Sequence, residues 1–378
     1  MLVKKQCVVV TSFDKNQPGY LDFSYRIKAL NNHYQLTIVS HRTLSQEEMQ
    51  FPIAQYHVIQ QGQGKLGWLM YCWKCADYIR KQKPSVVVLL HSGLSPIALL
   101  LSKVPTVLYW NEHPTNLVHL PAKRYFHRYL LSIIAQKLIF RGARHADLVM
   151  PIGEELRNEL IEMGCESTQV EMIYMGVADT FAASQKTNAV THGWLRLIYI
   201  GTVSQQRGRD VMLEAMTILA KKKIPVHLTI VGAWLDELTY CERKVQELGI
   251  SSQVSVFGRV GGSQIPKFLA ASDMGLCLWE DKPWWRFNPP TKLFEYLVAG
   301  LPVVASNIRT HTRYIQDWHN GLIFEYDANS LAEAIVELVR NQHMLVTLKK
   351  NAANSGKSYL WSCIEQQFIS AISRLNTA

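Results

Sequence analysis

The residues best placed for chemistry lie around one loop-and-helix pattern in the second half of the chain. In residues 288–306, NPPTKLFEYLVAGLPVVAS, two prolines precede Thr291, and apolar positions at helical spacing run on to Gly300. A helix that begins at Thr291, Lys292 and Leu293 presents free backbone N–H groups and a positive dipole end, which together favour a phosphate. We expect Thr291 to cap this helix. Glu295, one turn on, could accept hydrogen bonds from both ribose hydroxyls, or it is a solvated glutamate on an ordinary surface helix.

A second cation follows the predicted strand at residues 195–200. The sequence GTVSQQRG, residues 201–208, ends this strand and leads into a predicted helix. Arg207 then lies at the mouth of the second sheet, and its guanidinium could hold a pyrophosphate opposite the Thr291 helix start. Taken alone, an arginine at this position is more often a surface charge.

The first half offers two candidates at the carboxyl ends of predicted strands. Gly19, in the loop after the first strand, lets the backbone approach a ligand closely, or it is a plain turn glycine. His113 follows the strand at residues 106–110 and could donate to a sugar hydroxyl or cap a turn.

Two further patterns indicate little. Gly62, Gly64 and Gly67 form a G-x-G-x-x-G, but the pattern does not follow the first strand and lacks a ribose-binding acid, so a flexible loop is favoured over a dinucleotide site. Cys72 and Cys75 form a C-x-x-C inside a helical pattern, with no second ligand pair at metal-binding spacing. No D-x-D occurs, so we expect neither a metal nor another cofactor.

Apolar runs of strand length alternate with amphipathic helical stretches along the whole chain, which is typical of parallel sheets covered by helices. The small, polar residues 182–191 indicate a linker. The sequence therefore predicts an α/β protein of two Rossmann-like domains that face each other across a cleft, at residues 1–183 and 192–355, with residues 356–378 as a further helical segment. The predicted strands are at residues 7–11, 35–39, 86–90, 106–110, 147–151, 170–174, 195–201, 226–231, 254–257, 274–278 and 302–306.

Composition supports two globular domains. The chain has 378 residues, of which 48% are hydrophobic and 19% charged, and its seven cysteines are an odd number typical of reduced thiols. No apolar run is long enough to cross a bilayer and no cleavable signal is visible, so we expect a cytoplasmic protein. The net charge of +10 indicates an anionic partner without saying which.

Residues 121–146 carry six basic residues and no acidic one, interleaved with aromatic and aliphatic residues. This is the composition of a helix that lies on an anionic membrane surface, which would make the protein peripheral on the inner face of the plasma membrane. A core helix with its basic residues in water is the alternative. Helical spacing disfavours single-stranded nucleic acid, so we expect no nucleic-acid partner.

Seven segments in this order resemble the family 4 glycosyltransferases of GT-B fold. They are the loop at Gly19, RHADLVMPIGEEL from Arg144, VEMIYMGVADTF from Val170, IGTVSQQRG from Ile200, VSVFGRV from Val254, PPTKLFEYLVAGLPVVAS from Pro289 and NGLIF from Asn320. The resemblance implies a hexosyltransferase that moves a sugar from a nucleotide diphosphate sugar, with retention of anomeric configuration, to a glycan or lipid-linked acceptor in cell-envelope polysaccharide synthesis. The second domain would bind the donor and the first the acceptor, and residues 356–378, with Trp361, would form a crossover helix that packs back on the first domain.

The resemblance also implies roles for single residues. Arg207 is similar to the family's phosphate-binding lysine, Glu295 to the second glutamate of its E-x7-E motif, and His113 to a histidine near the donor sugar. The segment of Gly258, Arg259 and Val260 resembles the one that meets the base, and Gly201, Thr291, Lys292 and Leu293 belong to segments that bind the donor.

Two positions depart from the family pattern. Phe287 stands where the first glutamate of E-x7-E is expected, and Thr202 stands where a phosphate-binding arginine is usual. We expect Lys292 or Arg286 to supply the missing cation. A nucleotide-sugar epimerase of similar shape and a non-catalytic nucleotide-sugar sensor are the alternative functions.

Overall fold

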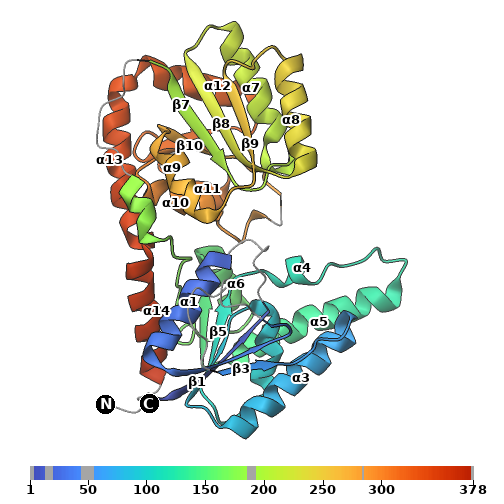
Figure 1. Ribbon diagram of the computed structural model, residues 1–378. Helices are drawn as coiled ribbons and strands as arrows, with labels where there is room; N and C mark the ends of the chain where they lie inside the picture. Colours follow the sequence, from blue (N-terminus) through green and yellow to red (C-terminus); the bar gives the residue numbers. More distant parts are fainter. Residues whose placement is uncertain (1–3, 13–19, 44–54, 185–192, 283–284, 376–378) are drawn as a thin grey trace. The chain divides into compact units, whose positions relative to one another are not determined.

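The structure is a computed structural model that describes residues 4–12, 20–43, 55–184, 193–282 and 285–375 (Figure 1). The chain divides into two compact units. The first comprises residues 1–176 together with 363–378, and the second comprises residues 177–362. Gly19 and most of the predicted linker, residues 182–191, lie outside the described residues.

The first unit is built on a parallel sheet of six described strands in the order β3-β2-β1-β4-β5-β6. The order reverses between β1 and β4, so the loops that follow these two strands diverge at the carboxyl edge of the sheet. Its elements are β1 (Gln6–Thr11), α1 (Tyr20–His33), β2 (Gln35–Ser40), β3 (Gln55–Val58), α3 (Gly64–Gln82), β4 (Val86–Leu89), η1 (Ser92–Leu100), β5 (Thr106–Trp110), α4 (Pro114–Leu117), α5 (Phe126–His145), β6 (Leu148–Pro151) and α6 (Glu154–Glu162).

The second unit repeats this plan with the strand order β12-β11-β10-β7-β8-β9, again parallel among its described strands. Here the order reverses between β7 and β10. Its elements are η2 (Asp179–Ser184), β7 (Leu195–Ile200), η3 (Gln205–Arg207), α7 (Arg209–Lys221), β8 (Val226–Ala233), α8 (Leu235–Glu247), β9 (Val254–Gly258), η4 (Gly262–Gln264), α9 (Ile265–Ala270), β10 (Met274–Cys277), α10 (Thr291–Val298), β11 (Val303–Ser306), α11 (Arg309–Thr312), β12 (Gly321–Phe324), α12 (Ala328–Arg340), η6 (Gln342–Met344), α13 (Leu345–Gly356), η7 (Lys357–Tyr359) and α14 (Trp361–Leu375), most of which returns to the first unit.

A buried ion pair fastens α14 to the first unit. The guanidinium of Arg26, in α1, donates from Nε to Asp22 Oδ2 at 2.9 Å and lies 4.9 Å from the ring centroid of Phe368, in α14. Tyr109, at the end of β5, donates its hydroxyl to the same Asp22 oxygen at 2.6 Å. Because every charge in this cluster is paired inside the core, the last helix is held in place by polar contacts as well as by packing.

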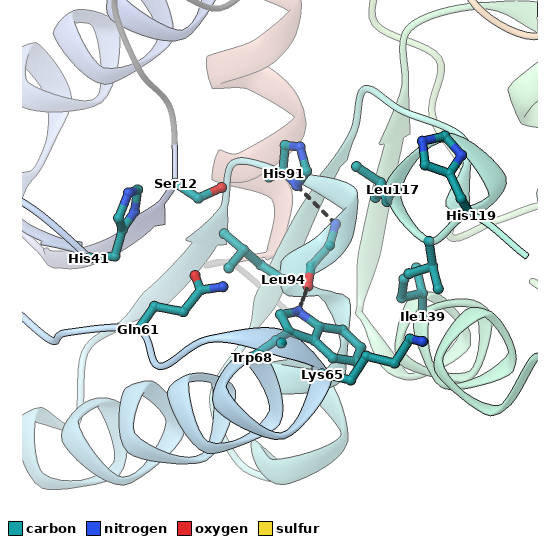
Figure 2. Close-up of a pocket in the computed structure, with 13 residues that line it drawn as sticks. Ser12, His41, Gln61, Lys65, Trp68, His91, Leu94, Leu117, His119 and Ile139 are labelled. Atoms are coloured by element: carbon teal, nitrogen blue, oxygen red, sulfur yellow. Dashed lines mark hydrogen bonds between the residues drawn. The ribbon is translucent and has the colours of Figure 1, made fainter. Parts of the chain in front are cut away.

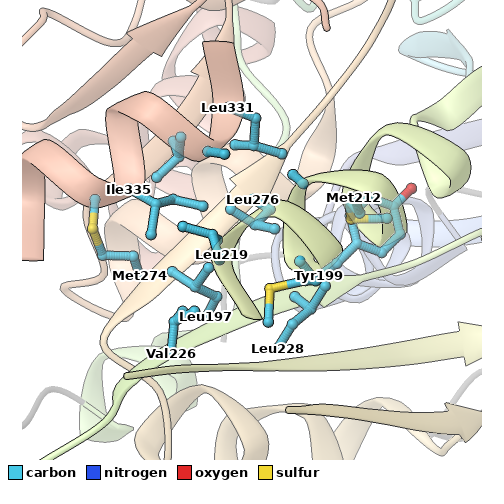
Figure 3. Packing of buried hydrophobic residues seen from close by; sticks show 14 of the residues in the cluster. Leu197, Tyr199, Met212, Leu219, Val226, Leu228, Met274, Leu276, Leu331 and Ile335 are labelled. Carbon is cyan, nitrogen blue, oxygen red and sulfur yellow. The ribbon is translucent and has the colours of Figure 1, made fainter. Parts of the chain in front are cut away.

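The core of the second unit fills the space between its sheet and helices α7 and α12. Figure 3 shows Leu197, Leu228 and Leu276 of the strands meeting Leu219 of α7 and Ile335 of α12. All of these side chains are buried, and strands covered on both faces need such continuous apolar runs. This packing explains why the strands could be predicted from hydrophobic runs alone.

Helix α10 is locked onto the sheet by Tyr296. Its hydroxyl accepts a hydrogen bond from the backbone N–H of Ile200 at 2.9 Å, and its ring lies so close to Gly275 of β10 that a Cβ there would meet ring carbons at 2.4 Å. A glycine in β10 is therefore required for α10 to approach. This contact sets the position of the residues in the first turn of α10 relative to the end of β7.

We expect Tyr296→Phe to lower the free energy of unfolding by about 1–3 kcal/mol, because the buried N–H of Ile200 loses its partner. Urea titration followed by circular dichroism measures this change. Tyr78→Phe is the matched control, since Tyr78 is only partly buried, stacks on His57 and makes no hydroxyl hydrogen bond within the described chain. An equal loss of stability in both variants would contradict the role given to the Tyr296 hydroxyl.

Two local predictions were wrong. Residues 170–174 form no strand: Val170 makes an isolated bridge to Val149, and Ile173 donates its N–H to the Pro151 carbonyl at 3.0 Å without completing a regular ladder. β3 and β12 were not among the predicted strands, because each has only four residues, QYHV and GLIF. Among the described helices, none has the length and apolar content that a bilayer span needs.

Candidate functional site

The candidate site of the second unit lies at the carboxyl ends of β7 and β10, where the strand order reverses. The loop from Gly201 leads from β7 into η3, and the loop from Leu278 leads from β10 towards α10. Loops that diverge from adjacent parallel strands leave a crevice, and open α/β sheets bind their ligands at this point. The topology therefore brings Arg207 and the start of α10 to one edge of one sheet.

Arg207 is held by aromatic rings. It ends η3, and the next residue, Gly208, has φ +81° and lies where a Cβ would meet the Leu278 Cβ at 2.6 Å. The guanidinium carbon lies 5.8 Å from the ring centroid of Trp279 and 5.2 Å from that of Trp285, and the two indoles stack at 4.5 Å. Within the described chain, no carboxylate lies within ion-pair distance of Arg207, so its charge is available to a ligand.

Lys292 is a buried cation without a hydrogen-bond partner. Its side chain is 5% exposed, and its Nζ lies 3.5 Å from the centroid of the Tyr199 ring and bonds to no described group. A Cβ on Gly201, whose φ is +101°, would lie 3.6 Å from this nitrogen. Burial, with a smaller contribution from the charge of Arg207, lowers the pKa of Lys292 to about 7. An ammonium in such a place is costly unless an anion joins it.

Glu295 lies on the same helix, one turn on. Its carboxylate is partly buried and makes no hydrogen bond within the described chain, and burial raises its pKa to about 7 against the opposing effect of Lys292. When ionised, this carboxyl can accept hydrogen bonds from hydroxyl groups of a ligand. When protonated, it can also donate one. Glu295 thus lies beside the helix start as expected, and its contact with a ligand stays a prediction.

The start of α10 differs from the prediction in two details. Thr291 does not cap the helix: Pro290 is the N-cap residue, no side chain caps the first turn, and Thr291 is the first helical residue, exposed to solvent. Leu293 is fully buried, and its N–H donates to the Pro290 carbonyl at 3.1 Å. The turn at the two prolines is closed by this hydrogen bond, so the N–H of Leu293 is not free for a ligand.

Arg286, the other predicted source of the missing cation, lies on the surface. It is paired with Asp281 by two hydrogen bonds of 3.1 and 3.2 Å, and both side chains are exposed. Of the two predicted cations, only Lys292 is buried beside Gly201.

In the first unit, His113 is buried, and the structure shows it capping a helix. Its Nδ1 accepts from the N–H of Thr115 at 3.2 Å at the start of α4, and its Nε2 lies 2.6 Å from Glu159 Oε1. Both ring nitrogens therefore have protein partners, so of the two predicted roles the turn cap is the one present. Donation to a sugar hydroxyl would first require the bond to Glu159 to break.

Two family models match adjacent stretches of the chain. The model described as "Glycosyltransferase Family 4" matches residues 26–181, and the one described as "Glycosyl transferases group 1" matches residues 183–355. The chain belongs to the family 4 glycosyltransferases. The resemblance predicted from its motifs is confirmed.

Curated relatives of this glycosyltransferase are distant. The amylovoran biosynthesis glycosyltransferase AmsK of Erwinia amylovora is 24% identical over 52% of this chain and 48% of its own length. A phosphatidyl-myo-inositol mannosyltransferase of Mycobacterium leprae is 25% identical over 46% of this chain and 45% of its own. The chain spans about half the length of the curated relatives it matches.

Similarity to a solved structure extends over nearly the whole glycosyltransferase. The Anabaena protein HepE, in its complex with UDP-glucose, superimposes with a TM-score of 0.72 over 98% of this chain and 100% of its own at 15% identity. At 15% identity this similarity shows the fold alone. Together with the two parallel sheets, it confirms the predicted α/β GT-B fold.

Arg259 and Val260 follow β9, the edge strand of the second sheet, and lie two strands away from β7. The guanidinium carbon of Arg259 lies 4.2 Å from the ring centroid of Trp234, which precedes α8 and is half exposed. The structure thus places these two residues at the same carboxyl edge of the sheet as Arg207 but does not bring them into contact with it.

Three aromatic residues of the site escaped prediction: Tyr199, Trp279 and Trp285. Trp279 is buried, and its indole N–H has no hydrogen-bond partner in the described part of the chain, which makes it a further available donor. Its position directly after β10 was the available signal, because the carboxyl ends of parallel strands are where ligands bind. Among the described residues there is no group of metal-binding side chains, and Cys72 and Cys75 are buried in α3.

Proposed function

We propose that this glycosyltransferase transfers a hexose from a nucleotide diphosphate sugar, with retention of anomeric configuration, to a glycan or lipid-linked acceptor of the cell envelope. The observation that carries the proposal is the buried Nζ of Lys292, which lacks a partner and shares the site with Arg207. Two uncompensated cations beside a glycine turn suit a diphosphate, because its charge removes the cost of burying them.

The chemistry follows from the charge that forms on the leaving group. When the bond between the anomeric carbon and the phosphate breaks, negative charge grows on the diphosphate, and Arg207 and Lys292 stabilise it without reorganising. The indole N–H of Trp279 is a third fixed donor. In this proposal the chain's own side chains neutralise the diphosphate, and Glu295 accepts hydrogen bonds from sugar hydroxyls.

Relatives support the substrate classes. The similar structure HepE was solved with UDP-glucose, a nucleotide diphosphate sugar. One relative is named for the biosynthesis of amylovoran and another for transfer to phosphatidyl-myo-inositol. These relatives favour sugar transfer over the alternative functions, an epimerase or a sugar sensor.

Arg259 extends the proposal to the nucleotide. Its guanidinium and the half-exposed Trp234 form a flat cationic and aromatic surface at the edge of the site, of the kind on which bases stack. We assign the base to this surface and the diphosphate to Arg207 and Lys292.

Slow hydrolysis of the donor without acceptor tests the proposed reaction. We expect proton NMR to show release of the α-anomer first from an α-linked donor such as UDP-glucose, because water takes the place of the acceptor on the retained face. Early release of the β-anomer would contradict retention. Appearance of an epimer would indicate the epimerase, and binding without any turnover would indicate the sensor.

A further inference from the structure

A cavity of about 600 Å³ lies within the first unit, at the edge where β1 and β4 adjoin (Figure 2). Ser12 follows β1 and His91 follows β4, so the cavity occupies the reversal point of this sheet, as the donor site does in the other unit. None of its lining residues is acidic. They are Ser12, His41, Gln61, Gly64, Lys65, Trp68, His91, Gly93, Leu94, Leu117, Val118, His119 and Ile139.

The polar part of the cavity offers hydrogen-bond donors and positive charge. His91 accepts a hydrogen bond from the N–H of Gly93 at its Nδ1, 3.1 Å away, so its other ring nitrogen carries the proton and is a donor. Lys65 Nζ donates to Ser132 Oγ at 2.8 Å, which uses one of the three ammonium donors. Together with His41 and His119, these groups suit a phosphate rather than a neutral sugar.

Apolar side chains share the lining of the cavity with these polar groups. Leu94, Leu117, Val118 and Ile139 contribute aliphatic surface, and Figure 2 shows Trp68 and Lys65 projecting from α3 beside them. The indole N–H of Trp68 donates to the Gly93 carbonyl at 2.8 Å, so this ring presents only carbon to the cavity. The cavity therefore offers a ligand both charge and hydrocarbon surface.

Two helices carry apolar surface away from the cavity. In α3, an exposed stripe at helical spacing adjoins the cavity face, and in α5 a second stripe begins near its first residue; we call them together the apolar track. Leu66 is 82% exposed and Phe126 63%. The bond between Lys65 and Ser132 joins the two helices. The track comprises Leu66, Leu69, Met70 and Trp73 of α3 with Phe126, Leu130, Leu131 and Ile134 of α5.

The charges around the track fit a negatively charged lipid. Within residues 121–146 all six basic side chains, among them Arg128, Lys137 and Arg141, are exposed, and the segment has no acidic residue. The second half of α5 packs on η1, where Gly142 approaches the Ser95 carbonyl too closely for any Cβ. The segment is thus a core helix at its end and an exposed apolar helix at its beginning, which combines the two predicted alternatives.

We propose that the cavity binds the phosphate or diphosphate head of a lipid-linked acceptor and that the hydrocarbon chain of this lipid follows the apolar track. The inference rests on the proposed function, since it identifies the class of acceptor. Lys65, His91 and His119 bind the head, and the track holds the chain against the membrane surface.

Farnesyl diphosphate, inorganic pyrophosphate and farnesol are suitable probes, titrated into the full chain by calorimetry. The nucleoside diphosphate that gives the largest thermal shift, at saturating concentration, keeps the probes out of the donor site. We expect farnesyl diphosphate to bind at least about tenfold more tightly than either fragment, because only the whole molecule uses both the cavity and the apolar track. Pyrophosphate binding as tightly as farnesyl diphosphate would overturn the proposal in favour of a soluble phosphorylated acceptor.

Two pairs of variants test the two ends separately. Lys65→Ala should weaken farnesyl diphosphate about tenfold or more, through loss of a charge-assisted hydrogen bond, whereas Ser132→Ala, which removes the same bond but keeps the charge, should not. Replacing Leu66 and Met70 by serine should weaken the binding of farnesyl diphosphate but not that of pyrophosphate. The control is Leu235→Ser, at a similarly exposed leucine of the other unit.

Unchanged farnesyl diphosphate binding in both Lys65→Ala and the track variant would overturn the proposal. Thermal stabilisation of the wild type by UDP-glucose tests the proposed function independently. A protein that UDP-glucose stabilises but that ignores farnesyl diphosphate overturns only the lipid inference.

Discussion

Replacing Arg207 by alanine is expected to slow sugar transfer, and the slow donor hydrolysis, by roughly a hundred- to a thousandfold. The guanidinium is fixed by Gly208 and by the stacked rings of Trp279 and Trp285, so it opposes the growing charge of the leaving group without first moving. Rates of UDP release from UDP-glucose, with and without acceptor, measure the effect.

Arg286→Ala is the matched control for this loss of charge. Arg286 belongs to the same loop region but is exposed and paired with Asp281, so its removal should change the rate less than about twofold. A loss of rate in Arg207→Ala no larger than in the control would show that Arg207 is an ordinary surface charge.

Lys292→Met is expected to act in opposite directions on stability and on binding. Without ligand the variant should be more stable, on the order of 1–3 kcal/mol, because a buried ammonium without a partner is replaced by an apolar side chain of similar length. Its affinity for a nucleoside diphosphate should fall about tenfold or more, since the cation beside Gly201 is lost. Denaturant titration and calorimetry measure the two quantities, and a variant that is less stable and binds normally would contradict both.

The pH dependence of binding gives Lys292 a second signature. Burial lowers its pKa from an ordinary 10.5 to about 7, and a bound diphosphate should raise the pKa again. Binding then takes up a proton above pH 7, so the affinity of the wild type should fall as pH rises above this value, by up to about tenfold per pH unit. Lys292→Met should lose this dependence, and calorimetry in two buffers of different ionisation enthalpy measures the proton uptake directly.

The stability of the ligand-free protein depends on both titrating groups. Between pH 7 and 10.5 the unfolded chain binds more protons at Lys292 than the folded protein does, so stability rises with pH in that range. Burial raises the pKa of Glu295 from 4.5 to about 7, so its contribution to stability is lost as pH rises through that interval. Together the two groups give the ligand-free protein its lowest stability near pH 7. A ligand therefore stabilises the protein most at this pH.

Much of the fold was predictable because buried parallel strands require apolar runs. The strand at residues 106–110 was predicted to the residue, and β7 and β8 nearly so, since both faces of each strand are covered. The strand predicted at residues 170–174 was wrong, because an apolar run does not show whether a regular ladder forms: this one makes an isolated bridge and separate hydrogen bonds to β6.

The site was predictable in its outline but not in its chemistry. Arg207 and the start of α10 could be placed because each follows a strand or opens a helix. The capping role of Thr291 failed because the proline turn places Pro290 at the N-cap. The burial of Lys292 against Tyr199 depends on the approach of α10 to β7, which Tyr296 and Gly275 determine across distant parts of the sequence. Local pattern cannot reveal such a contact.

The most direct test compares nucleoside diphosphates with monophosphates by calorimetry. UDP, GDP, ADP and CDP are first ranked by thermal shift, and the best of them and its monophosphate are then titrated into the wild type and Lys292→Met. We expect the wild type to prefer the diphosphate by about tenfold or more, and this preference to shrink by a similar factor in the variant. An equal preference in both proteins would contradict the claim that Lys292 binds the diphosphate of the donor.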